Sequence, residues 1–168
     1  MTDFDQFVAA HVDDLMRTAY LIVWDESEAE DLVQECLLKI ARRWPRVRRM
    51  EHPRAYARRV LVNQALDGAR RRAQRRSELE PDASASPIAV DPLPAIDTRA
   101  ELLQALSQLP ARQRTVLVLR YFNDLTETQV AEVLGCSPGT VKSSASRGLA
   151  RLREALQPLP FQPRSTET

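Results

Sequence analysis

TETQVAEVLGCSPGTVKSSASRGL, residues 126–149, is the stretch that decides how the C-terminal half of the chain folds. Apolar residues recur in it at three- and four-residue steps, which predicts two short helices. Gly135 readily takes the left-handed conformation that ends a helix, and Ser137 followed by Pro138 is typical of a helix start. The inner face of the second helix is predicted to carry Val141, Ala145, Leu149, Leu152 and Leu156.

The opposite face of this second helix is predicted to be small, polar and basic. Two short helices joined by a glycine turn, with such a face near the start of the second helix, describe a helix-turn-helix that can enter a DNA major groove. A surface helical hairpin without a partner is the alternative. The candidates for DNA contact are Thr140, Lys142, Ser143, Ser146 and Arg147.

The composition of the chain favours a globular, helical protein. Its apolar fraction of 43% is enough for a core, and apolar residues do not alternate with polar ones as they do in strands. There is no run of about 18 apolar residues and no signal-peptide pattern, so we expect no membrane insertion and a cytoplasmic location. His11, His52, Cys36 and Cys136 are isolated from one another, which argues against a disulfide, a metal site, a cofactor or histidine-based catalysis.

The net charge of +1 conceals a strong segregation of charge along the chain. Residues 1–36 hold ten acids and one base, whereas residues 37–76 hold fourteen bases and two acids. Residues 77–97 hold five acids and no base. Such blocks indicate different partners for different surfaces.

Two acidic helices are predicted at the N-terminus, over residues 3–23 and from Ser27, as N-cap, to about residue 44. The second would bury Ala29, Leu32, Val33, Cys36, Leu37 and Ile40. Its exposed face would hold Asp31, Gln34, Glu35 and Leu38. This acidic patch around one leucine is suited to a basic partner, and the alternative is a solvated face whose acids merely complement the helix dipole.

The basic block is predicted to form an exposed loop, residues 45–53, followed by a helix over residues 54–76. The loop carries Arg46, Arg48 and Arg49, and the inner side of the helix is predicted to include Ala55, Val60, Leu61 and Leu66. Arginine at this density repels itself unless phosphates neutralise it, so the block favours nucleic-acid binding over a solvated basic helix. The outer side of the helix would carry Arg54, Arg58, Arg59, Arg70, Arg71, Arg72, Arg75 and Arg76.

Residues 77–96 contain four prolines and four acids with almost no helical period, which predicts a flexible acidic linker. The chain is therefore expected to be all-α, with small helical domains at residues 1–76 and 97–157 and a frayed tail at 158–168. A helix that begins at Leu109-Pro110 is expected to lead into the helix-turn-helix. Its core candidates are Val116, Leu117, Leu119, Tyr121 and Phe122.

Motifs in both halves resemble the two-domain, extracytoplasmic-function sigma factors of bacterial RNA polymerase. The N-terminal likeness lies in Ala29-Glu30-Asp31-Leu32-Val33-Gln34-Glu35 and in Arg58-Arg59-Val60-Leu61-Val62-Asn63. The C-terminal likeness lies in Leu109-Pro110, Leu134-Gly135 and Gly139-Thr140-Val141-Lys142-Ser143. Ser144 departs from the family pattern, which usually has an arginine there, and this departure implies a weaker contact with DNA.

The resemblance implies a role for each block and no catalytic activity. Asp31, Gln34, Glu35 and Leu38 would dock on the clamp helices of the polymerase's largest subunit, and the C-terminal domain would contact the beta flap and read the −35 element of promoter DNA. An anti-sigma factor is an open further partner. The residues that would hold the −10 element are Arg46, Arg48, Arg49, Arg58, Arg59, Asn63, Arg70 and Arg71.

Two other functions are open at this point. A free-standing helix-turn-helix regulator would bind duplex DNA as a dimer, although no amphipathic dimerisation helix is evident in the sequence. A helical, metal-dependent nuclease would use the acids of the first two helices, but these acids are expected to line outward faces instead of a common pocket.

Overall fold

The computed structural model describes residues 1–79 and 98–156, and all regular secondary structure within these ranges is helical. The predicted all-α class is therefore confirmed. The first range contains α1 (Asp3–Val23), α2 (Glu26–Arg42), α3 (Trp44–Val47) and α4 (Pro53–Leu79). The second contains α5 (Thr98–Ser107), α6 (Ala111–Leu117), the π-helical turn η1 (Val118–Phe122), α7 (Glu127–Leu134) and α8 (Pro138–Leu156).

The expected linker and tail fall mostly outside the described residues. Residues 77–79 are the exception, because α4 continues through Leu79 and does not end at Arg76 as predicted.

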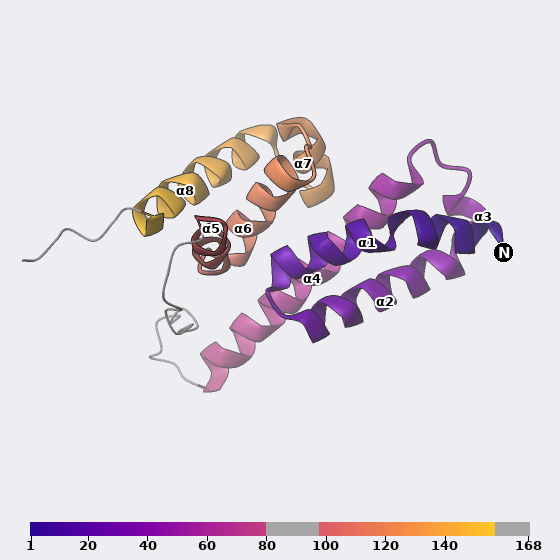
Figure 1. Cartoon of the computed structure of the whole chain (residues 1–168), viewed down its shortest axis with the longest axis horizontal. Helices are drawn as coiled ribbons and strands as arrows, with labels where there is room; N and C mark the ends of the chain where they lie inside the picture. The colour runs from indigo at the N-terminus through magenta and orange to yellow at the C-terminus, as the bar shows by residue number, and fades with distance from the viewer. Residues whose placement is uncertain (80–97, 157–168) are drawn as a thin grey trace, which may run out of the picture.

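In the N-terminal half, α1, α2 and α4 pack side by side along their lengths (Figure 1). Between α1 and α2 the chain reverses at Trp24, whose φ of 62° is left-handed, and Asp25 accepts a 2.7 Å hydrogen bond from the backbone N–H of Glu28. Asp25, and not Ser27, is thus the N-cap of α2. The buried core residues of this half are Phe7, Leu15, Ala19, Ile22, Ala29, Leu32, Val33, Cys36, Ile40, Val47, Ala57, Leu61, Val62, Ala65 and Leu66.

The segment between α2 and α4 is more ordered than an exposed loop. Trp44–Val47 form one helical turn, and Val47 is fully buried. The Trp44 ring lies with its centroid 5.2 Å from that of Phe4 and 5.0 Å from that of Phe7. These apolar contacts attach the segment to α1, so its arginines extend from an anchored turn.

In the C-terminal half, α6 packs closely on α8. A Cβ atom added at Gly148 would lie 3.0 Å from Leu117 Cδ1, so the glycine permits this close approach. Beyond Leu117 the helix widens into η1, where the N–H of Asn123 bonds the carbonyl oxygen of Val118 at 3.1 Å. The wider turn leaves Tyr121 and Phe122 55% and 49% exposed, so the prediction that they belong to the core is wrong.

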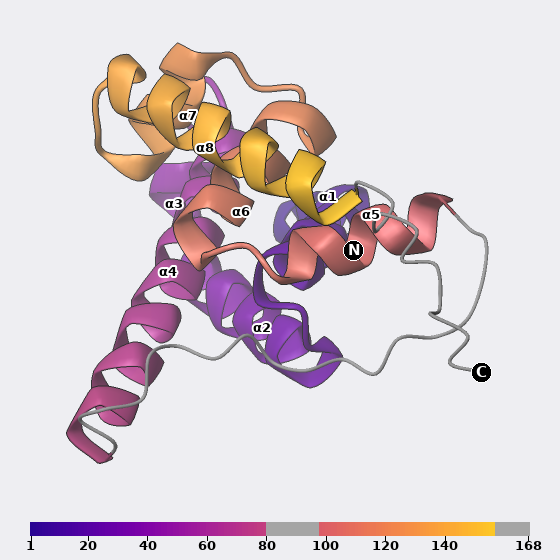
Figure 2. The same ribbon diagram turned by 90° about the vertical axis from the view of Figure 1, so that its left-hand side faces the viewer.

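The two halves pack directly against each other. Helix α7 lies beside α4, and α6 with η1 lies beside α1, as Figures 1 and 2 show from two sides. Figure 2 also shows that the C-terminal part of α4 extends away from the helices of the C-terminal half. A pocket between the halves nevertheless includes Ala69, Arg72 and Arg76 of α4, beside Ser107 and Arg114 of the C-terminal half.

Candidate nucleic-acid interface

The helix-turn-helix is formed by α7 and α8 and follows its local sequence signals. Thr126 Oγ1 accepts a hydrogen bond from the N–H of Gln129 at 3.2 Å, and the Gln129 side chain accepts one from the N–H of Thr126, which makes a capping box. Gly135 ends α7 with a φ of 63°. Ser137 Oγ accepts from the N–H of Thr140 at 3.1 Å and caps α8, as predicted.

The outward face of α8 has the predicted composition. Thr140, Lys142, Ser143, Ser146 and Arg147 are all exposed. No acid lies among them, so this face is positive and carries several hydrogen-bonding groups near the N-terminus of the helix. Such a face fits the edges and phosphates of a major groove.

The inner face of α8 differs from the sequence expectation in two places. Val141, Ala145 and Leu152 are buried as predicted, but Leu156 is 41% exposed. Ser144 is buried at 9% exposure. It lies on the core side of the helix, and the weaker DNA contact expected from a serine at this position stays a prediction.

The basic helix α4 presents Arg59 and Asn63 to solvent, but Arg58 is only 7% exposed. The prediction that Arg58 lies on the outer side of the helix is therefore wrong, and so is the prediction that Ala55 lies on the inner side, because Ala55 is exposed. Leu61, Val62 and Ala65 are buried three, four and seven positions after Arg58. This spacing places Arg58 in the middle of the buried stripe, so its burial can be predicted from the sequence.

Asp14 of α1 pairs with two arginines of α4. Its Oδ2 lies 3.0 Å from Arg54 Nη2 and 3.8 Å from Arg58 Nη2. Burial lowers the pKa of the Arg58 guanidinium, and the nearby charge of Arg54 lowers it further, while Asp14 opposes both. Arg58 stays charged, because the ordinary pKa of arginine is far above neutral pH.

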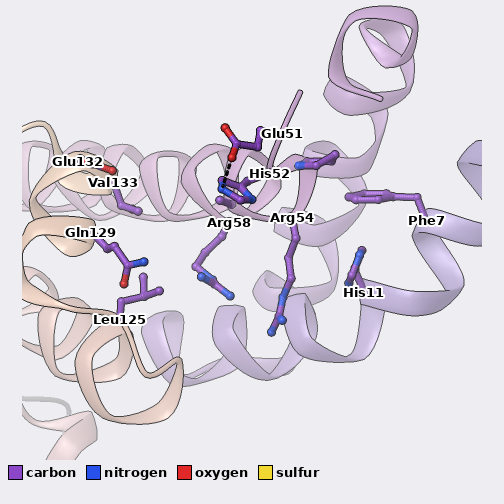
Figure 3. A pocket seen from close by; sticks show the side chains of 12 residues that line it. Phe7, His11, Glu51, His52, Arg54, Arg58, Leu125, Gln129, Glu132 and Val133 are labelled. Atoms are coloured by element: carbon purple, nitrogen blue, oxygen red, sulfur yellow. Dashed lines mark ion pairs between the residues drawn. The ribbon is translucent and has the colours of Figure 1, made fainter. Parts of the chain in front are cut away.

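A cavity of about 530 Å³ lies between the two halves over Arg58 (Figure 3). Phe7, His11 and Arg54 line it from the N-terminal half, and Leu125 and Gln129 line it from the C-terminal half. In Figure 3 the side chain of Arg58 extends between these two sets of residues. The cavity thus lies where the helix-turn-helix segment approaches the basic helix.

The other arginine candidates for the −10 element are exposed on two parts of the N-terminal half. Arg46, Arg48 and Arg49 surround α3, where Arg48 Nη1 lies 3.8 Å from Asp3 Oδ2. Arg70 and Arg71 lie further along α4, and Arg70 Nη1 is 3.5 Å from Asp67 Oδ1. These exposed pairs are weak, so their arginines are available to phosphates.

The acidic face of α2 is exposed as predicted. Asp31, Gln34 and Glu35 are exposed, and Leu38 is 59% exposed. Glu35 Oε1 lies 3.0 Å from Lys39 Nζ, and the hydrogen bond from Lys39 is the main reason that the pKa of Glu35 is lowered. Glu35 is therefore ionised and already paired within its own helix.

An apolar groove beside this face was not foreseen from the sequence. It is about 530 Å³ in volume, and Leu38 of the acidic face forms part of its wall. Phe4 and Val8 of α1 and Leu37 of α2 line it too. In the sequence, Phe4 and Val8 mark an apolar side of α1, and Leu38 is an exposed leucine on α2. Only the packing of the two helices brings these residues together into a groove.

Polar contacts hold the two halves together at the C-terminal end of α1. Arg114 Nε of α6 donates to the carbonyl oxygen of Ile22 at 2.7 Å, and its Nη1 donates to the carbonyl oxygens of Ser107 and Leu109 at 2.7 and 3.1 Å. Asn123 Nδ2 donates to Thr18 Oγ1 at 3.0 Å. Burial is the main cause of the lowered pKa of Arg114.

Within residues 1–79 and 98–156, no three histidine, cysteine or acidic side chains are grouped so that they could hold a metal ion. No helix in the same two ranges is both long enough and apolar enough to cross a bilayer.

Comparison with known families agrees with this geometry. The family described as Sigma-70 region 2 matches residues 7–76, and the family described as Sigma-70, region 4 matches residues 99–152. The first match covers the acidic and basic helices α2 and α4. The second covers the helix-turn-helix.

Relatives match along nearly the whole chain. The RNA polymerase sigma-E factor of Streptomyces avermitilis is 35% identical over 98% of this chain and 91% of its own length. The ECF RNA polymerase sigma factor SigM of Mycobacterium tuberculosis is 31% identical over 91% of this chain and 76% of its own length. A chain in the co-crystal structure of the sigma factor RpoE with the anti-sigma factor NepR, from Bartonella quintana, matches with a TM-score of 0.69 and 27% identity over 93% of this chain and 98% of that chain.

A basic helix, a helix-turn-helix and these full-length matches define a promoter-recognition subunit of RNA polymerase. The chain belongs to the sigma-70 family, in its extracytoplasmic-function (ECF) group. It acts with RNA polymerase in promoter-directed transcription initiation and is not a free dimeric regulator. Sigma factors are non-enzymatic transcription initiation factors.

Proposed function

We propose that the two halves of the chain divide the recognition of a promoter. Residues 1–76 would dock on core RNA polymerase and engage the −10 element, and residues 97–157 would read the −35 element. The observation that supports this proposal most directly is that α8 of the helix-turn-helix exposes a polar and basic face without acids, which includes Lys142, Ser143 and Arg147. Thr140 and Ser146 complete this reading face.

The −10 element is assigned to the exposed side of α4 and to the anchored turn around α3. Asn63 is exposed in the middle of α4 and offers both a donor and an acceptor to an unstacked base. Arg59 precedes it by about one helical turn and is placed for the adjacent phosphate. Arg46, Arg48, Arg49, Arg70 and Arg71 would hold phosphates on either side, which predicts a steep dependence of binding on salt.

The docking surface for core polymerase is assigned to the exposed face of α2. Asp31, Gln34 and Glu35 supply charge and hydrogen bonds, and Leu38 with the neighbouring groove supplies an apolar anchor. These features fit a basic, partly apolar helical surface such as the clamp helices of the largest subunit. On the C-terminal half, exposed Tyr121 and Phe122 offer an apolar surface for the beta flap.

An anti-sigma factor is a second partner that this proposal includes. The structure from Bartonella quintana is a complex of a sigma factor with an anti-sigma factor, and its matching chain covers 93% of the present one. Such a partner would compete with core polymerase for the exposed face of α2. Added core polymerase should then displace it in a concentration-dependent way.

Run-off transcription on a promoter library tests the division of roles. The purified chain with core polymerase should initiate at a small set of promoters, and substitutions in α4 and α8 should shift the preferred −10 and −35 sequences separately. Parallel binding assays would use the chain alone. Tight, sequence-specific duplex binding as a dimer without core polymerase would contradict the proposal.

A further inference from the structure

A cavity of about 540 Å³ lies where the end of α1, the start of α2 and the basic end of α4 meet α5 and α6. Its volume lies within the range that is typical of small-molecule sites. The residues that line it include three arginines, Arg72, Arg76 and Arg114, and an aromatic residue, Trp24. None of these four residues belongs to the surfaces assigned above to the promoter or to core polymerase, so the cavity has no role in those assignments.

Arg114 has one side-chain nitrogen that no protein acceptor uses. Its Nε and Nη1 donate to carbonyl oxygens, but within residues 1–79 and 98–156 its Nη2 has no acceptor. Burial lowers the pKa of Arg114, and the neighbouring charge of Arg72 lowers it further. The two guanidinium groups therefore repel each other at the wall of one cavity, and an anion bound between them would relieve this repulsion.

Two acids also line the cavity, and both already have partners. Glu28 pairs with Nη1 of Arg72, and Asp25 caps α2 by accepting a 2.7 Å hydrogen bond from the N–H of Glu28. Arg76 is exposed and has neither an ion pair nor a hydrogen bond with any described residue. The three arginines thus outnumber the acids, and the charge of Arg76 is available to an anionic ligand.

Trp24 brings an aromatic ring to the same cavity in a strained backbone conformation. Its φ of 62° is left-handed, which is unusual for a bulky residue, and such outliers gather at functional sites. Its ring is half-buried and stacks on Tyr20 with the ring centroids 5.4 Å apart. A glycine would make this turn without strain, so the tryptophan indicates a use for the indole ring.

We propose that this cavity binds a nucleotide, with its phosphates between Arg72, Arg76 and Arg114 and its base against Trp24. Guanidinium groups bind phosphate oxygens through paired N–H donors, and an aromatic ring stacks on a base of any sequence. An inorganic anion would use the arginines alone, whereas a nucleotide uses the arginines and the ring. The inference goes beyond promoter recognition and does not depend on it, because it uses no residue of the reading faces.

Isothermal titration calorimetry of the full chain with ATP, with GTP and with pyrophosphate tests the site. We expect saturable binding of at least one of the two nucleotides, and binding of pyrophosphate that is about five-fold weaker or more because it has no base to stack. Arg76→Gln should weaken nucleotide binding about five-fold or more, because it removes a charge-assisted contact with phosphate. Arg75→Gln is the matched control, because Arg75 is exposed beside Arg76 on α4 but does not line this cavity.

Removal of the indole ring provides an independent test. Trp24→Gly is chosen because glycine adopts the left-handed conformation of this residue freely, and circular dichroism would check that the variant is folded. We expect it to bind the nucleotide about five-fold more weakly or worse but to keep its affinity for pyrophosphate within about two-fold. Three results would overturn the proposal: no saturable binding of either nucleotide, equal losses in Arg75→Gln and Arg76→Gln, or unchanged nucleotide binding by Trp24→Gly.

Discussion

Arg114 Nε donates a 2.7 Å hydrogen bond to the carbonyl oxygen of Ile22, a residue 92 positions earlier in the chain. The same guanidinium group also bonds the carbonyl oxygens of Ser107 and Leu109. One side chain therefore satisfies acceptors at the end of α1 and in the turn between α5 and α6. Arg114 thereby links the C-terminal half to the end of α1.

Replacing Arg114 by Met should destabilise the fold. The substitution keeps much of the apolar stem but leaves three carbonyl oxygens without this donor, which should cost about 2–3 kcal/mol. Urea unfolding followed by circular dichroism would measure the loss. Arg112→Met is the matched control, because Arg112 is half-buried on the same helix and should change stability by less than about 0.5 kcal/mol. Equal effects of the two substitutions would contradict the role given to Arg114.

Two glycines of the helix-turn-helix should respond in opposite ways to alanine. Gly135 has a φ of 63°, so Gly135→Ala should cost about 1–2 kcal/mol although the space around it is open. Gly139 is helical, and a Cβ there would lie at an ordinary 3.8 Å from Ser137 Oγ, so Gly139→Ala should stabilise by about 0.4–1 kcal/mol. Chemical denaturation of both variants measures the two changes in stability. A loss of stability in Gly139→Ala would contradict the prediction for that residue.

Cys36 should make the stability depend on alkaline pH. Burial raises the pKa of its thiol from 9.0 to about 12. Because the folded protein holds the proton more tightly than the unfolded chain, this contribution is fully present below pH 9 and is lost as the pH rises toward 12. The difference in unfolding free energy between the unsubstituted chain and Cys36→Ala should therefore shrink across this range. A constant difference would show that the thiol does not titrate differently in the two states.

The helices could largely be predicted from the sequence because their signals are local. The α1 limits follow the apolar period, and the turn between α7 and α8 follows from Gly135, Ser137 and Pro138. Exposure of the α2 face and of the α8 reading face could be predicted for the same reason. To predict either face, it is enough to know which side of one helix is apolar.

The remaining features depend on contacts that periodicity does not encode. Asp25 caps α2 directly after Trp24, whose left-handed conformation is unusual for a bulky residue. Tyr121 and Phe122 turn outward because the π-helical turn changes the angular step between residues, so a 3.6-residue period fails there. Arg58 departs from the outward placement that its charge predicts because it falls within the buried stripe of α4.

Charge reversal on α2 should abolish association with core polymerase. Asp31→Lys with Glu35→Lys replaces two exposed acids by bases and also removes the acid that pairs with Lys39. Repulsion from a basic partner surface should reduce co-purification with core polymerase at least ten-fold, and less so at high salt. Glu26→Lys is the matched control, because Glu26 is exposed on α2 about 140° from Asp31 around the helix. Undiminished co-purification of the double variant would place the docking surface elsewhere.

Arg147 should distinguish base reading from phosphate binding on α8. It is exposed on the reading face, one helical turn after Ser143. If its guanidinium bonds a guanine in a bidentate way, Arg147→Ala should cost about 1–3 kcal/mol and relax the preference at one −35 position. Run-off transcription on a library randomised across the −35 element measures both quantities. Arg153→Ala is the control, since Arg153 is exposed on α8 but lies six residues, about 9 Å along the helix axis, beyond Arg147. A uniform loss over all −35 sequences would instead assign Arg147 to a phosphate, because a phosphate contact carries no base preference.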